Sequence, residues 1–471
     1  MRYKTYCFGD LVEKWIDNRG KTPPLSENGI PLLEVKHLPE SNLYPKIVGT
    51  KFVDKETYDS WFRAYLEPND ILFSTVGTTA RVVMTPPTET VAIAQNILGI
   101  RFKKDLVDPW FMFYYMRGKQ FQHDIEARLV TTVQASIKRA DMVGIPIAVP
   151  QLDAQKELVH RVISLDHKIQ LNQDINQTLE QMAQALFKSW FVDFEPVKAK
   201  MAVLESGGSQ ADAMLAAMTA ISGKDADALA VFEREHPEQY AELKATAELF
   251  PSAMRESELG EIPEGWYQTL LSELTGFLNG YAFKSKDWRE TGFPVVKIGS
   301  VKPGFVDLKN CSYIDGIGIK NLERFEVFSG DILVGMTGYP GETGIIPETM
   351  QRVYLNQRVG KFTPLFEFLY SYVYTLVRNN NFKIYVSGQA HGSAQANISS
   401  NDILQYPVVK PNDALLRAFD VVVRNLISLK LKNQAQIQSL EQLRDTLLPK
   451  LLSGEITLPE AEQAVSEVEN V

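Results

Sequence analysis

The chain has 471 residues, 45% of them hydrophobic, and a formal net charge of -9 at pH 7. A chain of this length and hydrophobic content buries more than one core and is expected to divide into domains. Its two cysteines, Cys7 and Cys311, argue against a disulfide framework and indicate a reducing compartment. The opening MRYKTYCFGD lacks the apolar run of a signal peptide, and no window approaches eighteen consecutive apolar residues. We therefore expect a cytoplasmic protein without membrane contact.

The negative charge is unevenly distributed along the chain. Residues 1–150 and 266–411 each carry +2, whereas residues 151–195, 196–265 and 412–471 carry -3, -7 and -3. Two mildly basic globular parts are thus joined by acidic connectors. This pattern permits DNA binding without requiring it, because a strongly basic domain would be the clearer footprint of a DNA-binding protein.

Residues 1–150 predict a mixed domain of strands and helices. The apolar runs IPLLEV from Ile30, DILFSTV from Asp70 and QNILGIRF from Gln95 are short and bounded by turn residues, which is typical of strands. The segment LVDPWFMFYYMRGKQFQHDI, residues 106–125, predicts a helix. Its aromatic residues fit a buried core better than a platform for stacking bases.

Two long segments of the chain share one helical pattern. Residues 152–190 contain no proline or glycine and predict one helix about 60 Å long, and residues 412–448 are a near twin. An unbroken seven-residue step through both gives a narrow apolar stripe that packs best against another helix, and one asparagine in each stripe is suited to fixing the register. The alternative is an ordinary amphipathic helix, but such helices average about eleven residues. The expected seam residues are Leu158, Leu165, Asn172, Leu179, Leu186, Phe419, Leu426, Asn433, Leu440 and Leu447.

The twin helices end a longer repeat, because the segments before them also match, at an offset of 261 residues. NDILFSTVG from Asn69 aligns with GDILVGMTG from Gly330, AQNILGI from Ala94 with LNQRVGK from Leu355, and VQASI from Val133 with AQANI from Ala394. FPVVKIG, DILVGMT and RVYLNQRVGKF then predict strands, and FEFLYSYVYTLVRNNNFKI predicts a helix. The sequence thus predicts one α+β unit used twice.

This repeat divides the chain into six expected segments. Between the copies, the acidic, alanine-rich stretch predicts short helices on a tether. The segments are a first globular domain (1–150), a central long helix (151–195), an acidic helical linker (196–265), a second globular domain (266–411), a distal long helix (412–454) and an acidic tail (455–471).

Three apparent catalytic motifs fail on inspection. RGKT at Arg19 lacks the first glycine of a phosphate-binding loop. DPWF at Asp108 lacks the second proline of the box with which amino-methyltransferases hold an adenine amine, and it fits a helix start with proline at the first position. Glu34-Val35-Lys36 has the spacing of a metal-dependent nuclease, but it lies in a predicted strand and no partner aspartate motif accompanies it. The six histidines are scattered without ligand spacing, so no metal site is expected.

The whole pattern resembles the specificity subunit of a Type I restriction-modification system. The motifs that carry the resemblance are the DIL strands at Asp70 and Asp331, the Gln-Ala-[Ser/Asn]-Ile runs at Gln134 and Gln395, IPIAVPQLDAQ at Ile145, FPSAMRESELGEIPEGW at Phe250 and LRDTLLPKLLSGEI at Leu443. The sequence departs from the family pattern at Gln151 and at PNDALLRAF from Pro411, so the start of the second helix is less well defined.

The resemblance implies a non-catalytic subunit with two target-recognition domains. Each would read half of a split site on double-stranded DNA, and the two long helices would pack as an antiparallel coiled coil with pseudo-twofold symmetry. The expected protein partners are two modification (methyltransferase) subunits and restriction or translocase subunits. S-adenosylmethionine, ATP and Mg are expected on those partners, and no cofactor on this chain.

The matched motifs do not say which residues contact DNA, so we choose loop side chains that can discriminate base edges. Because the two copies have diverged, the two half-sites should differ. The candidates are Arg19, Lys21, Thr78, Thr79 and Arg81 in the first domain and Lys284, Lys286, Thr337 and Tyr339 in the second.

Two other functions stay open at this point. A self-contained DNA methyltransferase would bind S-adenosylmethionine in the isolated chain. A coiled-coil assembly scaffold without base readout would tolerate alanine at all loop candidates without any effect on DNA.

Overall fold

The computed structural model describes residues 3–18, 20–40, 42–131, 135–258, 260–309, 311–338, 340–390 and 396–453. The chain divides into two compact units, unit 1 with Met1–Asn172 and Gln436–Val471, and unit 2 with Gln173–Ala435. Each unit therefore combines one globular domain with parts of both long helices. The expected acidic tail lies outside the described residues. Within the described part of the chain, no helix is long and apolar enough to cross a membrane.

In unit 1, the globular domain that precedes the first long helix (domain 1) is built on two main sheets. A four-stranded sheet has the order β2-β8-β5-β6, and a three-stranded sheet has the order β4-β3-β7. Two-stranded ladders pair β1 with β11 and β9 with β10. The strands are β1 Tyr3–Cys7, β2 Val12–Asp17, β3 Ile30–Leu33, β4 Lys51–Val53, β5 Ile71–Ser74, β6 Val82–Met84, β7 Ala92–Ile93, β8 Ile97–Phe102, β9 Val130–Thr131, β10 Ala135–Ser136 and β11 Pro146–Pro150. The helices are α1 Phe8–Leu11, η1 Val35–His37, α2 Lys55–Trp61, α3 Pro109–Arg117, α4 Lys119–Glu126 and α5 Arg139–Val143.

In unit 2, the globular domain between the linker and the second long helix (domain 2) repeats this plan with a larger second sheet. Its sheets have the orders β15-β25-β22-β23 and β16-β20-β17-β24-β21, and β12-β13, β14-β26 and β18-β19 form ladders. The strands are β12 Met254–Arg255, β13 Ile262–Pro263, β14 Tyr267–Leu270, β15 Thr275–Asn279, β16 Trp288–Arg289, β17 Phe293–Val296, β18 Val301–Lys302, β19 Phe305–Val306, β20 Ser312–Ile314, β21 Glu326–Val327, β22 Ile332–Gly335, β23 Thr343–Ile345, β24 Val353–Leu355, β25 Val359–Pro364 and β26 Pro407–Lys410. The helices are η2 Leu271–Glu273, η3 Ser285–Asp287, η4 Ile298–Ser300, η5 Leu322–Phe325, η6 Glu367–Leu369, α11 Tyr370–Arg378, α12 Asn380–Gln389 and α13 Ser400–Leu404.

The aromatic segments of both domains are interrupted where one helix each was expected. Gly118 separates α3 from α4 and Asn379 separates α11 from α12, both with extended backbone. The single strand expected at residues 352–362 is likewise divided into β24 and β25. The core role of the aromatic residues is confirmed, since Phe111, Phe113 and Tyr114 are at most 1% exposed.

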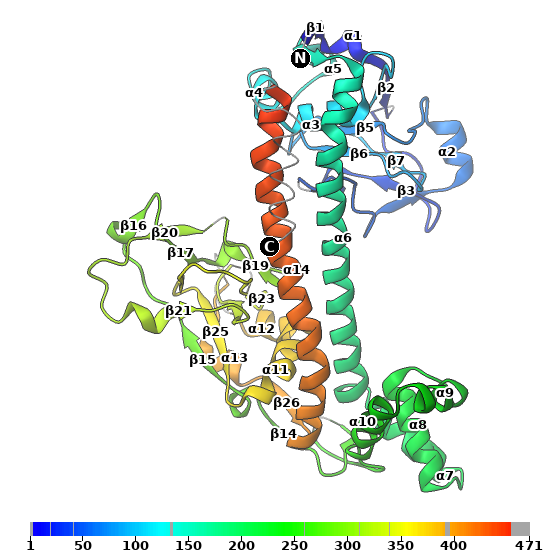
Figure 1. Ribbon diagram of the computed structural model, residues 1–471, viewed down its shortest axis with the longest axis vertical. Helices are drawn as coiled ribbons and strands as arrows, with labels where there is room; N and C mark the ends of the chain where they lie inside the picture. The colour runs from blue at the N-terminus through cyan, green and yellow to red at the C-terminus, as the bar shows by residue number, and fades with distance from the viewer. Residues whose placement is uncertain are drawn as a thin grey trace. The chain divides into compact units, whose positions relative to one another are not determined.

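The two long helices, α6 Leu152–Phe191 and α14 Asp413–Ser453, run side by side in opposite directions within each unit (Figure 1). In unit 1, Leu165 and Ile169 of α6 pack with Ile437 and Leu440 of α14. In unit 2, the rings of Phe187 and Phe419 lie 6.4 Å apart. Residue numbers therefore rise along α6 as the numbers of their partners on α14 fall, so the two helices are antiparallel.

Most of the expected seam residues are buried. Seven of the ten are at most 9% exposed, and the other three are half-buried. The buried residues are Leu158, Leu165, Asn172, Leu179, Phe419, Leu440 and Leu447, and the half-buried ones are Leu186, Leu426 and Asn433. The seam asparagine of α6 does have a polar partner, because Asn172 Nδ2 donates to Gln436 Oε1 at 2.7 Å.

A buried charged cluster joins domain 2 to both helices. Glu180 of α6 forms an ion pair with Lys430 of α14 at 2.7 Å and with Arg378 of α11 at 3.1 Å. The Tyr374 hydroxyl donates to the same carboxylate, and Lys430 Nζ also donates to that hydroxyl oxygen at 2.9 Å and to Gly304 O at 3.2 Å. One carboxylate therefore connects the two helices and the domain.

Electrostatics keeps this carboxylate ionised. Burial by itself raises the pKa of Glu180, but the positive charges of Lys430 and Arg378 outweigh burial and lower the pKa from 4.5 to about 2. Since the pKa is lower in the folded state, the cluster contributes stability above about pH 4.5 and loses that contribution as the pH falls toward 2.

Unit 1 contains a cluster of the same design. Asp166 of α6 forms an ion pair with Arg444 of α14 at 2.6 Å, and the Tyr114 hydroxyl of α3 donates to Asp166 at 2.7 Å. Burial lowers the pKa of Arg444, but the charge of Asp166 outweighs burial, so its pKa is raised overall. In both units, an acid on α6, a base on α14 and a tyrosine of the globular domain thus meet at a largely buried position, where each charged side chain is at most 17% exposed.

The linker between the domains is a packed element rather than a tether. It folds as α7 Glu195–Glu205, α8 Gln210–Ser222, α9 Ala226–Glu235 and α10 Pro237–Glu248. Met218, Leu229 and Ala247 belong to a core of its own. Lys200 Nζ donates to the carbonyls of Ala247 and Phe250, each at 2.6 Å, and so fixes α7 to the end of α10.

The Glu180 cluster predicts an asymmetry between single and double substitutions. Glu180→Leu leaves two cations buried without their shared carboxylate, and we expect it to lower the free energy of unfolding by about 3–5 kcal/mol. The double variant Glu180→Leu/Lys430→Leu should recover most of this loss, because it replaces one buried ion pair by apolar packing. Urea denaturation of the full chain measures both. Equal losses in the two variants would show that the ion pair does not account for the effect.

Candidate functional site

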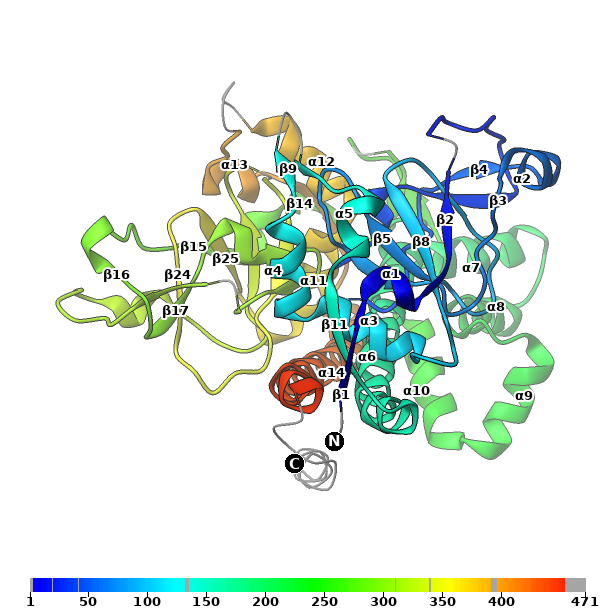
Figure 2. The ribbon, with the colours of Figure 1, turned by 90° about the horizontal axis from the view of Figure 1, so that it is seen from above.

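Two loops leave domain 1 at the same edge of its four-stranded sheet. Strand β8 lies between β2 and β5 and is antiparallel to both (Figure 2). Asp17 at the end of β2 and Phe73 near the end of β5 both pair with Leu98. The loops that follow β2 and β5 therefore begin at the same level, on either side of the start of β8.

Domain 2 has the same edge. Strand β25 lies between β15 and β22, and Asn279 and Val334 both pair with Gly360. The loops after β15 and β22 consequently flank the start of β25. We call these two places the sheet edges of domains 1 and 2.

The turn that follows β5 in domain 1 and the turn that follows β22 in domain 2 have the same hydrogen bonds. Gly77 N–H donates to Ala135 O at 3.1 Å, and Gly338 N–H donates to Ala396 O at 2.9 Å. Ala80 N–H donates to Ser74 O at 2.9 Å, as Gly341 N–H does to Gly335 O at 3.0 Å. The turns also share positive φ angles, 79° and 78° at the two first glycines and 63° and 88° at Ala80 and Gly341. The duplication has thus kept the backbone while the side chains changed.

The candidates of domain 1 fall into two groups at its sheet edge. Lys21 is exposed on the loop after β2, and Thr78 is exposed and Thr79 half-buried on the turn after β5. Arg81 is instead engaged within the domain, because Nη1 donates to Leu38 O at 2.9 Å and its backbone N–H donates to Ser74 Oγ at 2.9 Å. Arg19 lies outside the described residues.

The candidates of domain 2 are distributed in the same way. Lys284, immediately before η3, and Lys286, within η3, are exposed on the segment after β15. Thr337 lies on the turn after β22, and its Oγ1 donates to Asn397 Oδ1 at 2.8 Å. Tyr339 lies outside the described residues.

The structure also shows two exposed polar dipeptides at the centre of these edges that sequence reasoning missed. Gln95-Asn96 precedes β8, and Gln357-Arg358 precedes β25. Ile71 pairs with Ile100, whereas its equivalent Ile332 pairs with Phe362, so the offset in these strands is 262 and not 261. The alignment of AQNILGI with LNQRVGK was therefore wrong by one residue, which hid the glutamine that both domains share.

The aspartates of the DIL motifs have structural partners. Asp70 accepts from Glu67 N–H at 2.8 Å and from Arg101 Nε and Nη2 at 2.9 and 2.8 Å. Asp331 accepts from Phe328 N–H at 2.7 Å and from Lys361 Nζ at 2.6 Å. Each closes the turn into its strand and is neutralised by a base of the neighbouring strand. The motif is scaffold in both domains, while Gln134 and Gln395 lie outside the described residues.

The motifs of other enzyme classes have structural explanations. Asp108 caps α3 by accepting from Trp110 N–H at 2.9 Å, with proline in the first turn, as expected. The Glu34-Val35-Lys36 motif was wrongly placed in a strand, because β3 ends at Leu33 and η1 begins at Val35. Hydrogen bonds from Lys36 and Lys51 lower the pKa of Glu34 to about 2. Across the residues that the structure covers, no three His, Cys, Asp or Glu side chains gather to hold a metal.

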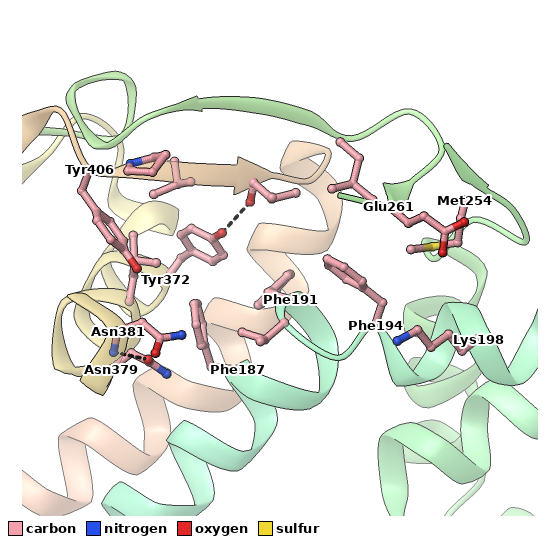
Figure 3. A pocket seen from close by; sticks show the side chains of 16 residues that line it. Phe187, Phe191, Phe194, Lys198, Met254, Glu261, Tyr372, Asn379, Asn381 and Tyr406 are labelled. Atoms are coloured by element: carbon pink, nitrogen blue, oxygen red, sulfur yellow. Dashed lines mark hydrogen bonds between the residues drawn. The ribbon is translucent and has the colours of Figure 1, made fainter. Parts of the chain in front are cut away.

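A cavity of about 440 Å³ lies at the end of α6 in unit 2 (Figure 3). Phe187, Phe191 and Tyr372 form its wall, and Tyr372 OH donates to Val409 O at 2.6 Å. These rings belong to the core that joins domain 2 to α6, and none of the candidate DNA contacts that the structure describes lines the cavity. We therefore assign the candidate site to the sheet edges.

Comparison with known proteins gives this arrangement its family. Residues 2–181 and 263–437 match the model of the Type I restriction modification DNA specificity domain. The chain belongs to this family. It is accordingly a specificity subunit, the non-catalytic DNA-recognition component of a Type I restriction-modification system. Helices α7 to α10 lie between the two matched segments.

Individual relatives have the same designation. The chain is 28% identical over 405 residues to the Type I restriction enzyme HindI specificity subunit of Haemophilus influenzae, covering 83% of this chain and 87% of that protein. It is 22% identical over 385 residues to the MjaIX specificity subunit of Methanocaldococcus jannaschii, covering 79% and 76%. Among solved structures, the S subunit from M. genitalium is similar with a TM-score of 0.46 and 14% identity, over 96% of each chain.

The contacts of Arg81 and Thr78 predict opposite phenotypes on one turn. Arg81→Ala removes a charged hydrogen bond to Leu38 O, so we expect it to destabilise by about 1.5–3 kcal/mol and to leave sequence preference unchanged. Thr78→Ala should change stability by less than about 0.5 kcal/mol, since the side chain is exposed, and should weaken DNA binding. Thermal melts and DNA titrations separate the two. A change of preferred sequence in Arg81→Ala would contradict this assignment.

Proposed function

We propose that this specificity subunit reads a bipartite asymmetric DNA target, with one half-site for each domain. The observation that carries the proposal is the repeated sheet edge, in which the same backbone turn presents different side chains. Lys21, Thr78, Lys284 and Lys286 at these edges supply donors for phosphates and bases. A duplicated reader whose halves have diverged suits a target with two different half-sites.

We further propose that the two long helices act as a spacer and as the docking surface for two modification subunits. Ile175 and Met182 of α6 are 39% and 48% exposed, and Val421, Val422 and Leu429 of α14 are 67%, 43% and 50% exposed. Exposed apolar side chains on helices that already have a partner favour contact with further helices. Restriction or translocase subunits would join this complex through the modification subunits.

In this proposal the chemistry belongs to the partner subunits and takes place in the cytoplasm. S-adenosylmethionine, ATP and Mg would bind there, and this chain would hold no cofactor. A self-contained methyltransferase is the opposing hypothesis. Calorimetry of the isolated chain with S-adenosylmethionine tests it, and micromolar binding would overturn the division of labour proposed here.

Domain exchange tests the assignment of one half-site to each domain. Replacing residues 1–145 with those of a relative should change one half-site and leave the other intact. The graft should retain a tyrosine at position 114, because Tyr114 bonds to Asp166 on the helix that is kept. Mapping of methylated adenines in cells that carry the modification partner gives both half-sites. A change in both, or in neither, would refute the assignment.

If the exposed apolar residues of α6 bind a modification subunit, charged substitutions there should weaken assembly of the complex without changing the DNA sequence that is recognised. Ile175→Glu/Met182→Glu should lower the number of modification subunits bound, because a partner helix would have to bury two charges. Val231→Glu is the matched control, since Val231 is 40% exposed on α9, a linker helix that packs with α8 and α10. Mass photometry with saturating modification subunit measures the stoichiometry. Identical complexes in both variants would exclude this face of α6 as the docking surface.

A further inference from the structure

The dipeptides Gln95-Asn96 and Gln357-Arg358 occupy the most central position of the two sheet edges. Gln95-Asn96 immediately precedes β8, which lies between β2 and β5, and Gln357-Arg358 immediately precedes β25, which lies between β15 and β22. Each dipeptide therefore lies between the two loops that carry the other candidates. All four residues are exposed. A duplex that contacts both loops of one domain must pass over this position.

The backbone of both dipeptides is held by the flanking loops. Thr75 N–H donates to Asn96 O at 2.9 Å, and Met336 N–H donates to Arg358 O at 3.0 Å, at equivalent places in the two domains. In domain 2, Gln357 N–H also donates to Tyr281 O at 2.9 Å, on the other flanking loop. Backbone held in this way limits the entropy lost when the side chains bind.

The side chains of both dipeptides have no polar partner among the described residues. Those of Gln95, Asn96, Gln357 and Arg358 make no hydrogen bond or ion pair with any residue that the structure describes. This contrasts with Arg81 and Thr337, because Arg81 Nη1 and Thr337 Oγ1 each donate to an oxygen inside their own domain. Free polar side chains on a fixed backbone have the properties of a base-reading position.

We infer that these two dipeptides read base edges, an inference that rests on the proposed function. Glutamine and asparagine amides pair with adenine through one donor and one acceptor, and an arginine guanidinium pairs with the two acceptors of guanine. The glutamine common to both domains reads one base in each half-site. Asn96 and Arg358, which differ between the copies, favour adenine in one half-site and guanine in the other, and so make the target asymmetric.

Selection from a randomised double-stranded DNA library tests this inference. The full-length chain is assembled with its modification subunit, and bound DNA is sequenced at fixed salt. Arg358→Ala should lose roughly 5- to 150-fold of discrimination for guanine at one position of one half-site. Asn96→Gly should relax one position of the other half-site, and glycine keeps the positive φ of 70° at this residue accessible. Each variant is therefore the control for the other domain.

Arg352→Ala is the matched arginine control in domain 2. Arg352 is 63% exposed and its Nε lies 3.5 Å from Glu326 Oε1. It immediately precedes β24, whereas Gln357-Arg358 follows the other end of that strand, so its removal should leave both half-sites unchanged. Thermal melts establish that all variants fold.

Three results would be decisive against the inference. If Arg358→Ala weakened binding equally for all sequences and lowered the salt slope by about 1, Arg358 would contact phosphate and base reading would be refuted. Unchanged half-sites in folded Arg358→Ala and Asn96→Gly would also refute it, while the proposed function would stand. If the wild-type complex selected no bipartite sequence, the proposed function itself would fail.

Discussion

The structure depends on the two buried charge clusters that pair α6 with α14. The leucines of the seven-residue stripe do not fix a register by themselves, because a shift by one heptad brings leucine against leucine again. The ion pairs Asp166 with Arg444 and Glu180 with Lys430 do fix it, since a shift would bury each charge without its partner. The residue numbers of both pairs add to 610, so both require the same alignment. A tyrosine from each globular domain then bonds to the acid, and the position of the domain follows from that of the helices.

Sequence reasoning predicted the scaffold because the scaffold is periodic and repeated. The heptad step identified α6 and α14, and the duplication identified two α+β domains. The breaks at Gly118 and Asn379 were missed because an aromatic core pattern continues across them, and the chain gives no apolar signal for one extended residue. The charge clusters were not predicted, although Lys430 and Arg444, two bases on the helix that carries the second stripe, were a usable signal for them.

The candidate site was harder to predict, because exposed loops carry no periodicity. Residue type alone suggested Arg81, but hydrogen bonds to Leu38 and Ser74 engage it within domain 1, and sequence cannot reveal these. Gln95 and Gln357 were passed over because strand β25 is shifted by one residue relative to β8 in the repeat. Pairing partners, not sequence similarity, determine which residues of the two domains are equivalent.

The division of the chain into units has a consequence for its synthesis. Unit 2 is continuous, Gln173–Ala435, whereas unit 1 needs residues from both the start and the end of the described chain. Tyr3 OH donates to Leu452 O at 3.2 Å, and Leu447 and Leu451 belong to the core of unit 1. Domains generally fold as units while they leave the ribosome. Unit 2 can therefore close first, and the nascent domain 1, although translated earlier, must wait with part of its core uncovered until the second half of α14 emerges. Domain 2 is therefore expected to complete its fold before domain 1, and domain 1 should be the one that depends on chaperones.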